Sequence, residues 1–378
     1  MAVLTEEQTM LRDSAREWAK SNAPVSAFRK MRDSNNELGF DKGTFTSVAE
    51  MGWTGVVIPE NYGGSEFGYR GIGLVLEELG RTLVAAPLIG SAVGAASALI
   101  LGGTEAQKKA WLPKIADGSV VAALAIDEGT RHEPENIVMA ATKSGGGYSL
   151  TGTKTFVMEG MAAKVFVVAA RTSGKPGETK GITLFVVPAD AKGIKRARRA
   201  MIDSRGYAEV TFDKVEVGAD DVLGKADEGF DLLDRTLDRA RAAVAAEAYG
   251  LALQAFETTL EYMKTRVQFG QTIGSFQALQ HRAAKLFTDI QMARGTVDAA
   301  LNAIDANSPD TAEMVSLAKA TINDLVNLVS REMIQMHGGI GMTDAHDAGF
   351  YIKRARTLEA SFGTSAYHRE RYAKIKGV

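Results

Sequence analysis

YSLTGTKTFVM, residues 148–158, is the first of several short runs that are rich in β-branched and aromatic residues. Three similar runs follow: AKVFVVAAR (163–171), GITLFVVPAD (181–190) and YAEVTFDKVEV (207–217). Turn-forming segments such as SGKPGETK separate them, and runs of this kind between Gly-rich and Pro-containing turns predict β-strands. The region from about residue 121 to 228 is therefore expected to be all-β.

Helical patterns lie on both sides of this region. Residues 1–120 carry apolar side chains at helical spacing, and the helical period returns after residue 228, with helices expected at about 276–305, 310–336 and 345–375. Because strands and helices are segregated along the chain, a parallel α/β sheet is disfavoured. The sequence predicts an α+β fold with an N-terminal α-helical domain (1–120), a central β domain (121–228) and a C-terminal helical domain (229–378).

Composition excludes several classes of function. The chain has 378 residues and a formal net charge of -2, so there is no electrostatic reason to expect a nucleic acid or an anionic membrane surface as partner. It contains no Cys, which excludes disulfides, thiolate nucleophiles and cysteine metal sites, and its His residues are too scattered to predict a metal site. The long uncharged stretch 83–103 is dominated by small residues and contains Pro87, so we expect a packed helix and no membrane insertion. A cytoplasmic location agrees with this composition.

Familiar catalytic motifs are missing. The chain has no G-x-S-x-G elbow and no Walker A loop, so hydrolase and kinase functions lose their main support. The Gly-rich segment MHGGIGMTDAHDAG (336–349) follows a helix and not a strand, which disfavours a Rossmann dinucleotide site. The basic stretch 192–206 is expected to be a solvated face, with phosphate or partner docking as the alternative.

Several motifs together resemble the acyl-CoA dehydrogenase family over nearly the whole chain. They are MGWTGVVIPENYGG (51–64), EELGR (77–81), WLPKIADG (111–118), RVQFGQTIGSFQALQHRAAKLF (266–287) and QMHGGIGM (335–342). The resemblance implies a C-terminal four-helix bundle, FAD bound between subunits and an acyl-CoA substrate. It further implies that a Glu base removes the α-proton while a hydride moves to the flavin, giving the trans-2-enoyl-CoA, and that electrons pass to an electron-transfer flavoprotein.

The same resemblance implies a set of FAD-binding residues. For the adenosine and pyrophosphate they are Arg266, Gln268 and Phe269, together with Gln335, Gly338 and Gly339 from a second subunit; for the flavin side they are Ile126, Phe156, Met158 and Thr364. An Arg offers a fork of donors to phosphate, and Gly lets backbone N–H groups approach it closely.

The usual base is absent. Where the family has Tyr-Glu-Gly-Thr this chain has SFGT (361–364), so Phe362 replaces the Glu, and a second family solution, a Glu directly before Arg241, is replaced by Ala240. Glu247 lies seven residues after Ala240, which brings it within about 20° of the same helix face. We therefore expect Glu247 to be the α-proton base, oriented by Arg241. The alternatives are that Glu247 pairs with a basic residue on a neighbouring helix or faces solvent.

The segments that match the flavin-ring contacts also depart from the family pattern. They are IDEGTRHEPENI (126–137) and FVM (156–158). In this respect the chain resembles subunits of mixed α2β2 acyl-CoA dehydrogenases that act on bulky steroid or bile-acid side-chain thioesters. The main expectation is thus an acyl-CoA dehydrogenase, as a homo-oligomer or an α2β2 heterotetramer. The alternatives are a non-catalytic subunit that completes an FAD site, or a flavin monooxygenase or oxidase of the same fold.

Overall fold

The computed structural model describes residues 4–378, which divide into two compact units. The first, here called the helical unit, comprises the residues up to Arg29, Tyr69–Val84 and Arg241–Val378. The second, here called the β unit, comprises Lys30–Gly68 and Ala85–Ala240.

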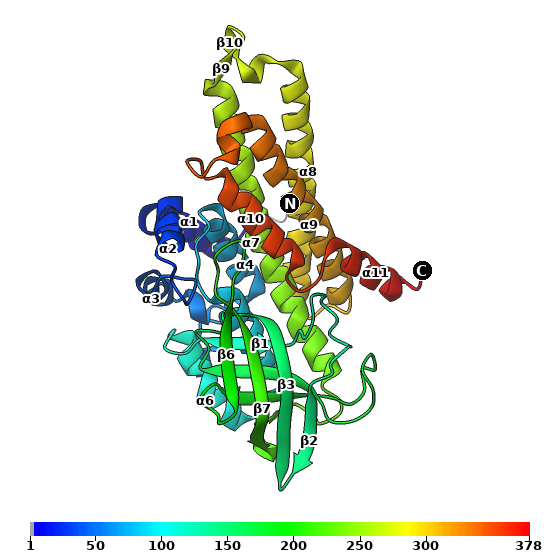
Figure 1. Cartoon of the computed structure of the whole chain (residues 1–378). Helices are drawn as coiled ribbons and strands as arrows, with labels where there is room; N and C mark the ends of the chain where they lie inside the picture. Colours follow the sequence, from blue (N-terminus) through cyan, green and yellow to red (C-terminus); the bar gives the residue numbers. More distant parts are fainter. Residues whose placement is uncertain (1–3) are drawn as a thin grey trace. The chain divides into compact units, whose positions relative to one another are not determined.

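An eight-stranded sheet is the centre of the β unit. Its strands are β1 (Ala122–Ala125), β2 (Ala140–Ser144), β3 (Gly147–Met158), β4 (Val165–Arg171), β5 (Ile182–Pro188), β6 (Ile194–Arg199), β7 (Tyr207–Gly218) and β8 (Val222–Leu223). The order is β6-β7-β3-β2-β4-β5-β8, with β1 paired to β4, and Figure 1 shows β6, β7, β3 and β2 side by side. The pairings are antiparallel except those of β4 with β1 and with β2. The predicted α+β class is confirmed.

Burial within the sheet follows the composition of the strands. All seven residues of β4 are buried, as are the first six of β5, which agrees with their nearly continuous apolar sequences. The edge strand β6, IKRARR, is instead mostly exposed. Charged edge strands discourage unwanted strand pairing, which agrees with the basic sequence of β6, and the expectation of a solvated face over 192–206 stays a prediction.

Helices complete the β unit. They are α3 (Lys42–Glu50), the π-helix η3 (Leu88–Ala95), α5 (Ala96–Gly102) and α6 (Glu105–Ala116), with the 3-10 turns η1 (Trp53–Gly55), η2 (Glu60–Tyr62) and η4 (Ala219–Asp221). Every residue of η3 is buried, which is the packed arrangement expected for the uncharged stretch 83–103. Among residues 4–378, no helix is long and apolar enough to cross a membrane.

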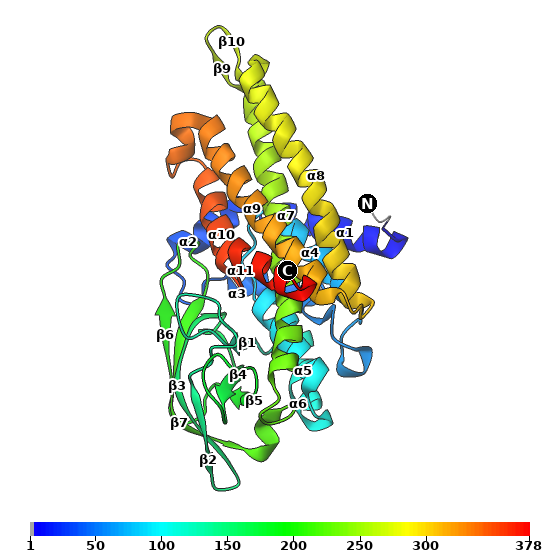
Figure 2. The same cartoon turned by 90° about the vertical axis from the view of Figure 1, so that its right-hand side faces the viewer.

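The helical unit is built mainly from long helices. These are α1 (Glu6–Asn22), α4 (Gly68–Arg81), the part of α7 (Phe230–Thr265) after Ala240, α8 (Gln277–Asp305), α9 (Thr311–His337), α10 (Ala348–Ala360) and α11 (Ser365–Lys376); α2 (Val25–Asp33) begins in this unit. Figure 2 shows α8 and α9 running alongside each other. Thr5 caps α1 through a capping box with Gln8, which satisfies two N–H groups at the helix start.

The last predicted helix, 345–375, is wrong as a single element. The structure breaks it at residues 361–364 into α10 and α11. Phe362 and Gly363 have φ angles of 54° and 116°, values that no α-helix contains, and Thr364 caps the new helix by accepting a hydrogen bond from Tyr367 N. The break places the SFGT segment in a loop.

α4 and α7 cross with their backbones in close contact. A Cβ atom added to Gly250 on α7 would lie 1.8 Å from the carbonyl oxygen of Glu77, and one added to Gly80 on α4 would lie 2.4 Å from that of Glu247. Residues 242–246 of α7, which are Ala or Val, are all buried. The small residues of 239–254 therefore allow this close packing, and they place Glu247 where α4 crosses.

Candidate functional site

Glu247 is held by an ion pair inside the helical unit. The residue is only 5% exposed, and Arg354 on α10 is 4% exposed. Arg354 Nε donates to Oε1 of Glu247 at 2.7 Å, and Nη2 donates to Oε2 at 2.8 Å. This two-point geometry is the strongest form of the Arg–carboxylate interaction. Glu247 therefore pairs with a basic residue on a neighbouring helix, which was one of the alternatives that the sequence left open. Its role as the α-proton base stays a prediction.

The SFGT loop is fixed through its carbonyl groups. Phe362 O accepts hydrogen bonds from Arg241 Nε at 3.3 Å and from the His368 ring at 3.1 Å. Gly363 O accepts from Lys319 Nζ at 3.3 Å and from Asn323 Nδ2 at 3.2 Å. Each of two successive carbonyls therefore has two buried donors, which stabilises the unusual backbone angles of the loop.

Arg241, Lys319 and His368 form what we call the buried basic cluster. All three are 0% exposed, and Arg241 also donates to the hydroxyl of Tyr367 at 3.0 Å. Burial, reinforced by the charge of Arg241, lowers the pKa of Lys319 to about 7. Burial and the neighbouring Arg241 and Lys319 charges likewise lower the pKa of His368, which is therefore neutral at pH 7.

Sequence reasoning identified Arg241 but missed the other members of this cluster. Lys319 lies in the mostly apolar run VSLAKATI of α9, and a charged residue on the buried face of a helix is the signal that was available. His368 lies on α11, and its Nδ1 atom is buried without a hydrogen-bond partner in the part of the chain that the structure describes. The position of the cluster depends on the break between α10 and α11.

The Lys319 environment predicts a pH-dependent stability. In the folded chain its pKa is about 7, whereas its ordinary value is 10.5, so between these values the unfolded chain binds a proton that the folded chain does not. The free energy of unfolding should therefore rise as pH increases from about 7 to 10. It should fall again when pH is lowered from 10 to 7. Urea unfolding at several pH values measures this slope. Lys319→Met should abolish the Lys319 contribution, and an unchanged slope in that variant would contradict the assignment.

A hairpin carries the first set of predicted FAD residues in the helical unit. After Arg266, strands β9 (Val267–Gln268) and β10 (Gln271–Thr272) are joined by Phe269 and Gly270, whose φ angles are 54° and 78°. The Phe269 side chain is 91% exposed. Arg266 and Gln268 are also exposed, so a charged fork, an amide and an aromatic face are all available to a ligand.

The second predicted set lies at the end of α9. Gly338 has a φ angle of 65°, and no atom lies within 4 Å of the Cβ positions of Gly338 or Gly339, so their backbone is open to close approach. Gln335 is exposed. His337 stacks on Tyr262 with ring centroids 4.3 Å apart, which brings the end of α9 next to the end of α7 that leads into Arg266. Open Gly backbone together with an Arg fork and an exposed ring fits the adenosine and pyrophosphate of FAD.

The remaining FAD candidates divide between the units. In the β unit, the segment at Ile126 meets the end of β3, because Lys154 Nζ donates to Ile126 O at 2.9 Å and to Glu128 at 2.6 Å. Met158 is 9% exposed, and Phe156 has a φ angle of 50°. The central guanidinium carbon of Arg199 lies 4.9 Å from the centre of the Phe156 ring. Thr155 Oγ is buried with no hydrogen-bond partner among residues 4–378, which leaves a polar atom for a ligand beside these residues.

Thr364 is exposed in the helical unit, where it caps α11. A metal centre has no support in the described part of the chain, since no group of three or more His, Cys, Asp or Glu side chains is placed to hold an ion.

Comparison with known protein families gives three matches along the chain. Residues 5–119 match the acyl-CoA dehydrogenase N-terminal domain, residues 123–215 the middle domain and residues 227–376 the C-terminal domain. A curated relative, the probable acyl-CoA dehydrogenase YngJ of Bacillus subtilis (strain 168), is 30% identical over 97% of each chain.

Solved structures are similar over the same length. The ChsE4–ChsE5 complex from Mycobacterium tuberculosis contains a chain with 25% identity and a TM-score of 0.90, covering 100% of this chain and 99% of the other. A variant of the steroid ACAD Tcur3481–Tcur3483 has 29% identity and a TM-score of 0.89, covering 98% of both chains. The chain belongs to the acyl-CoA dehydrogenase family, whose members are FAD-dependent oxidoreductases.

Proposed function

We propose that this chain is the subunit of a mixed acyl-CoA dehydrogenase that completes the FAD site, while a second kind of subunit provides the α-proton base. The observation that carries this proposal is the Glu247–Arg354 pair, in which both carboxylate oxygens already accept hydrogen bonds from one guanidinium. The other two positions at which the family has a Glu are occupied here by Phe362 and Ala240. Neither side chain can accept a proton.

Two of the similar structures support an assembly of two different chains. ChsE4–ChsE5 is a complex, and Tcur3481–Tcur3483 is a steroid ACAD with two named components. We infer for this chain the same type of assembly, acting on an acyl-CoA thioester and passing electrons to an electron-transfer flavoprotein. A bulky acyl group, such as a steroid side chain, is the substrate class that these relatives suggest.

The residues of this chain then have binding roles. Arg266 and Gln268 would hold the FAD pyrophosphate, and Phe269 would cover the adenine. The open backbone at Gly338 and Gly339 would contact the adenosine and pyrophosphate of an FAD that is shared with a second subunit. When bound, FAD supplies the acceptor for the hydride that leaves the β-carbon of the thioester. Phe156 and Met158 would contact the flavin, and the unpaired hydroxyl of Thr155 would be available to it.

The competing function is a homo-oligomeric acyl-CoA dehydrogenase in which Glu247 is the base. This function is supported by the position of Glu247 on α7, two turns after Ala240. Some members of the family have a Glu at the position of Ala240. For catalysis Glu247 would have to release at least one hydrogen bond from Arg354 and reach the α-carbon.

An anaerobic reductive titration separates the two functions. The chain is purified alone and as a co-expressed complex with an acyl-CoA dehydrogenase subunit that retains a Glu at the position of Phe362 or Ala240. Each sample is supplied with FAD and mixed with straight-chain, branched and steroid-side-chain acyl-CoAs, and the flavin absorbance is followed. We expect bleaching in the complex and none with the chain alone.

Glu247→Gln is the matched variant, because it preserves side-chain size and one acceptor for Arg354. In the complex it should leave the bleaching rate within a few-fold of wild type. Bleaching by the chain alone that disappears in Glu247→Gln would overturn the proposal and establish Glu247 as the base.

A further inference from the structure

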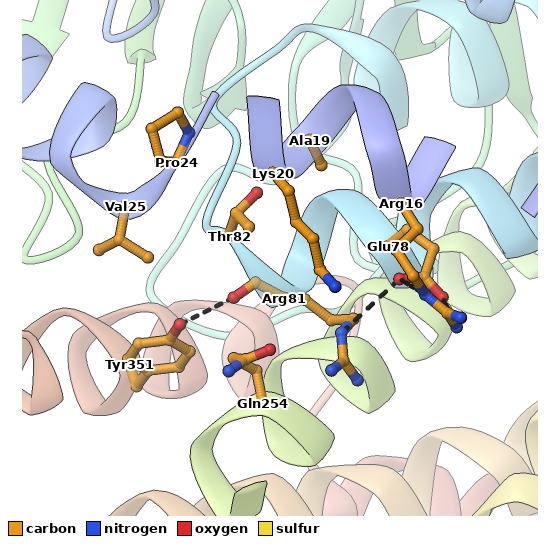
Figure 3. A pocket seen from close by; sticks show the side chains of 10 residues that line it. All are labelled: Arg16, Ala19, Lys20, Pro24, Val25, Glu78, Arg81, Thr82, Gln254 and Tyr351. Carbon is orange, nitrogen blue, oxygen red and sulfur yellow. Dashed lines mark hydrogen bonds and ion pairs between the residues drawn. The ribbon is translucent and has the colours of Figure 1, made fainter. Parts of the chain in front are cut away.

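A hollow of about 270 Å³ lies in the helical unit beside the C-terminal end of α1 (Figure 3). Its lining consists of four apolar or aromatic residues, three basic residues and three others: Ala19, Pro24, Val25 and Tyr351; Arg16, Lys20 and Arg81; Glu78, Thr82 and Gln254. None of these residues belongs to the groups assigned above to FAD, to the SFGT loop or to the base. The hollow therefore requires an explanation of its own.

Two of the three cations around the hollow are paired with acids. Arg16 donates two hydrogen bonds to the buried carboxylate of Glu78, at 2.7 and 3.1 Å. Arg81 Nε lies 3.6 Å from the same carboxylate, and Arg81 also pairs with Glu257. Lys20 is exposed and has no ion-pair partner in the described chain, and Figure 3 shows its amine extending from α1 toward Arg81. Arg16 also lies 3.8 Å from Asp13, so both arginines have acidic partners, and it is the charge of Lys20 that favours an anionic ligand.

Two polar side chains add unused hydrogen-bonding capacity. Thr82 Oγ is buried and has no hydrogen-bond partner within residues 4–378. Gln254 uses one amide N–H, which donates to Thr258 Oγ at 3.2 Å. A buried hydroxyl without a partner is costly, so a ligand oxygen beside Thr82 would satisfy it.

The opposite wall of the hollow is apolar. Pro24 and Val25 present aliphatic surface on the side of the Tyr351 ring, whose hydroxyl is already engaged with Arg81 O at 2.7 Å, whereas Ala19 lies beside Lys20 and Arg16 (Figure 3). At about 30 Å³ for each atom the size of a water molecule, the volume accommodates about nine non-hydrogen atoms. This is the size of a small aliphatic acid.

We propose that this hollow binds a short-chain monocarboxylate of about four to seven carbons. The carboxylate lies against Lys20 and the Thr82 hydroxyl, and the alkyl chain lies against Pro24, Val25 and the Tyr351 ring. The site is independent of the proposed FAD-completing function, and it makes the chain responsive to free short-chain acids in addition to CoA thioesters.

Isothermal titration of the full-length chain with sodium butyrate, hexanoate and octanoate tests the site. Each buried methylene should tighten binding up to about fourfold, so hexanoate should bind about tenfold more tightly than butyrate. Octanoate, which has more non-hydrogen atoms than the hollow accommodates, should give no further gain. Hexanol and hexylamine serve as neutral and cationic probes of the same length, and both should bind at least tenfold more weakly than hexanoate.

Two variants locate the binding. Lys20→Met should weaken hexanoate binding at least tenfold and bring it to the level of hexanol, whereas Lys109→Met, at another exposed helical lysine, should bind as wild type does. Val25→Trp should abolish binding by filling the hollow, and its melting temperature shows whether it is folded. The proposal would be overturned if hexanoate showed no saturable binding at concentrations up to about 10 mM, or if wild type and Lys20→Met bound it equally well.

Discussion

Arg354→Ala is expected to lower the free energy of unfolding by about 3–5 kcal/mol. The substitution leaves the Glu247 carboxylate 5% exposed, with the two hydrogen bonds from Arg354 removed. A buried charge without compensation is far more costly than the pair itself, because burial has already removed its hydration. Urea unfolding followed by circular dichroism measures the change.

Replacing both partners should recover most of that loss. In the double variant Glu247→Leu with Arg354→Met, apolar side chains of similar volume take the place of the pair, and such replacements are often neutral or stabilising. The double variant should therefore be at least about 2 kcal/mol more stable than Arg354→Ala. An exposed pair, Lys285 with Asp289 at 3.0 Å, is the control: Lys285→Ala should change stability by less than about 1 kcal/mol.

The same double variant has a functional consequence. Under the proposed function it retains activity in the complex, since neither side chain takes part in proton abstraction. If Glu247 were the base, the double variant would be inactive however stable it is. An unfolding free energy for Arg354→Ala equal to wild type would instead show that the ion pair is not maintained in solution.

The sequence predicted the class of the fold and most of its elements because these depend on local patterns. Strand runs such as 163–171 and 207–217 are bounded by turn signals, and the observed β4 and β7 overlap them closely. The helix predicted over 345–375 failed because its interruption needs positive φ angles at Phe362 and Gly363, and a Phe gives no local signal for such a conformation.

The partner of Glu247 lies beyond what one sequence reveals. Arg354 is 107 residues further along the chain, and several other basic residues of α10 and α11 were equally available as partners. The selection depends on how α10 packs against α7, which in turn depends on the close crossing of α4 and α7 at Gly80 and Gly250. The sequence therefore raised the pairing as an alternative but had no means to identify Arg354.

The buried basic cluster was missed for a related reason. Lys319 and His368 are separated by 49 positions and converge only because the chain turns back at the SFGT loop. A Lys in an apolar helical run suggests burial, but it does not reveal that its hydrogen bonds go to the Leu358 and Gly363 carbonyls and to the Asn323 amide oxygen, and not to an acid. The cluster holds the carbonyl groups of the loop and places the Arg241 charge beside Phe362, which determines how an acid at this position would ionise.

Phe362→Glu is expected to create α-proton exchange in this chain. The substitution restores the acid that the family has at this position, on a loop whose carbonyls are already held by Arg241, His368, Lys319 and Asn323. The neighbouring Arg241 charge favours an ionised carboxylate, the form that a general base needs. A positioned base typically contributes a factor of about 10²–10⁴, so exchange at the α-carbon should rise by that order.

The measurement follows deuterium uptake at C2 of an acyl-CoA in D₂O by mass spectrometry, with the FAD-supplied chain. Exchange needs no net hydride transfer, so it reports the base alone. Phe362→Gln, which has the same shape but no basic oxygen, is the control and should remain at the wild-type rate. If Phe362→Glu exchanges no faster than Phe362→Gln, the loop does not face a thioester in this chain. Rapid exchange already in wild type, lost in Glu247→Gln, would instead mean that the chain contains its own base, and the assignment as an FAD-completing subunit would have to be abandoned.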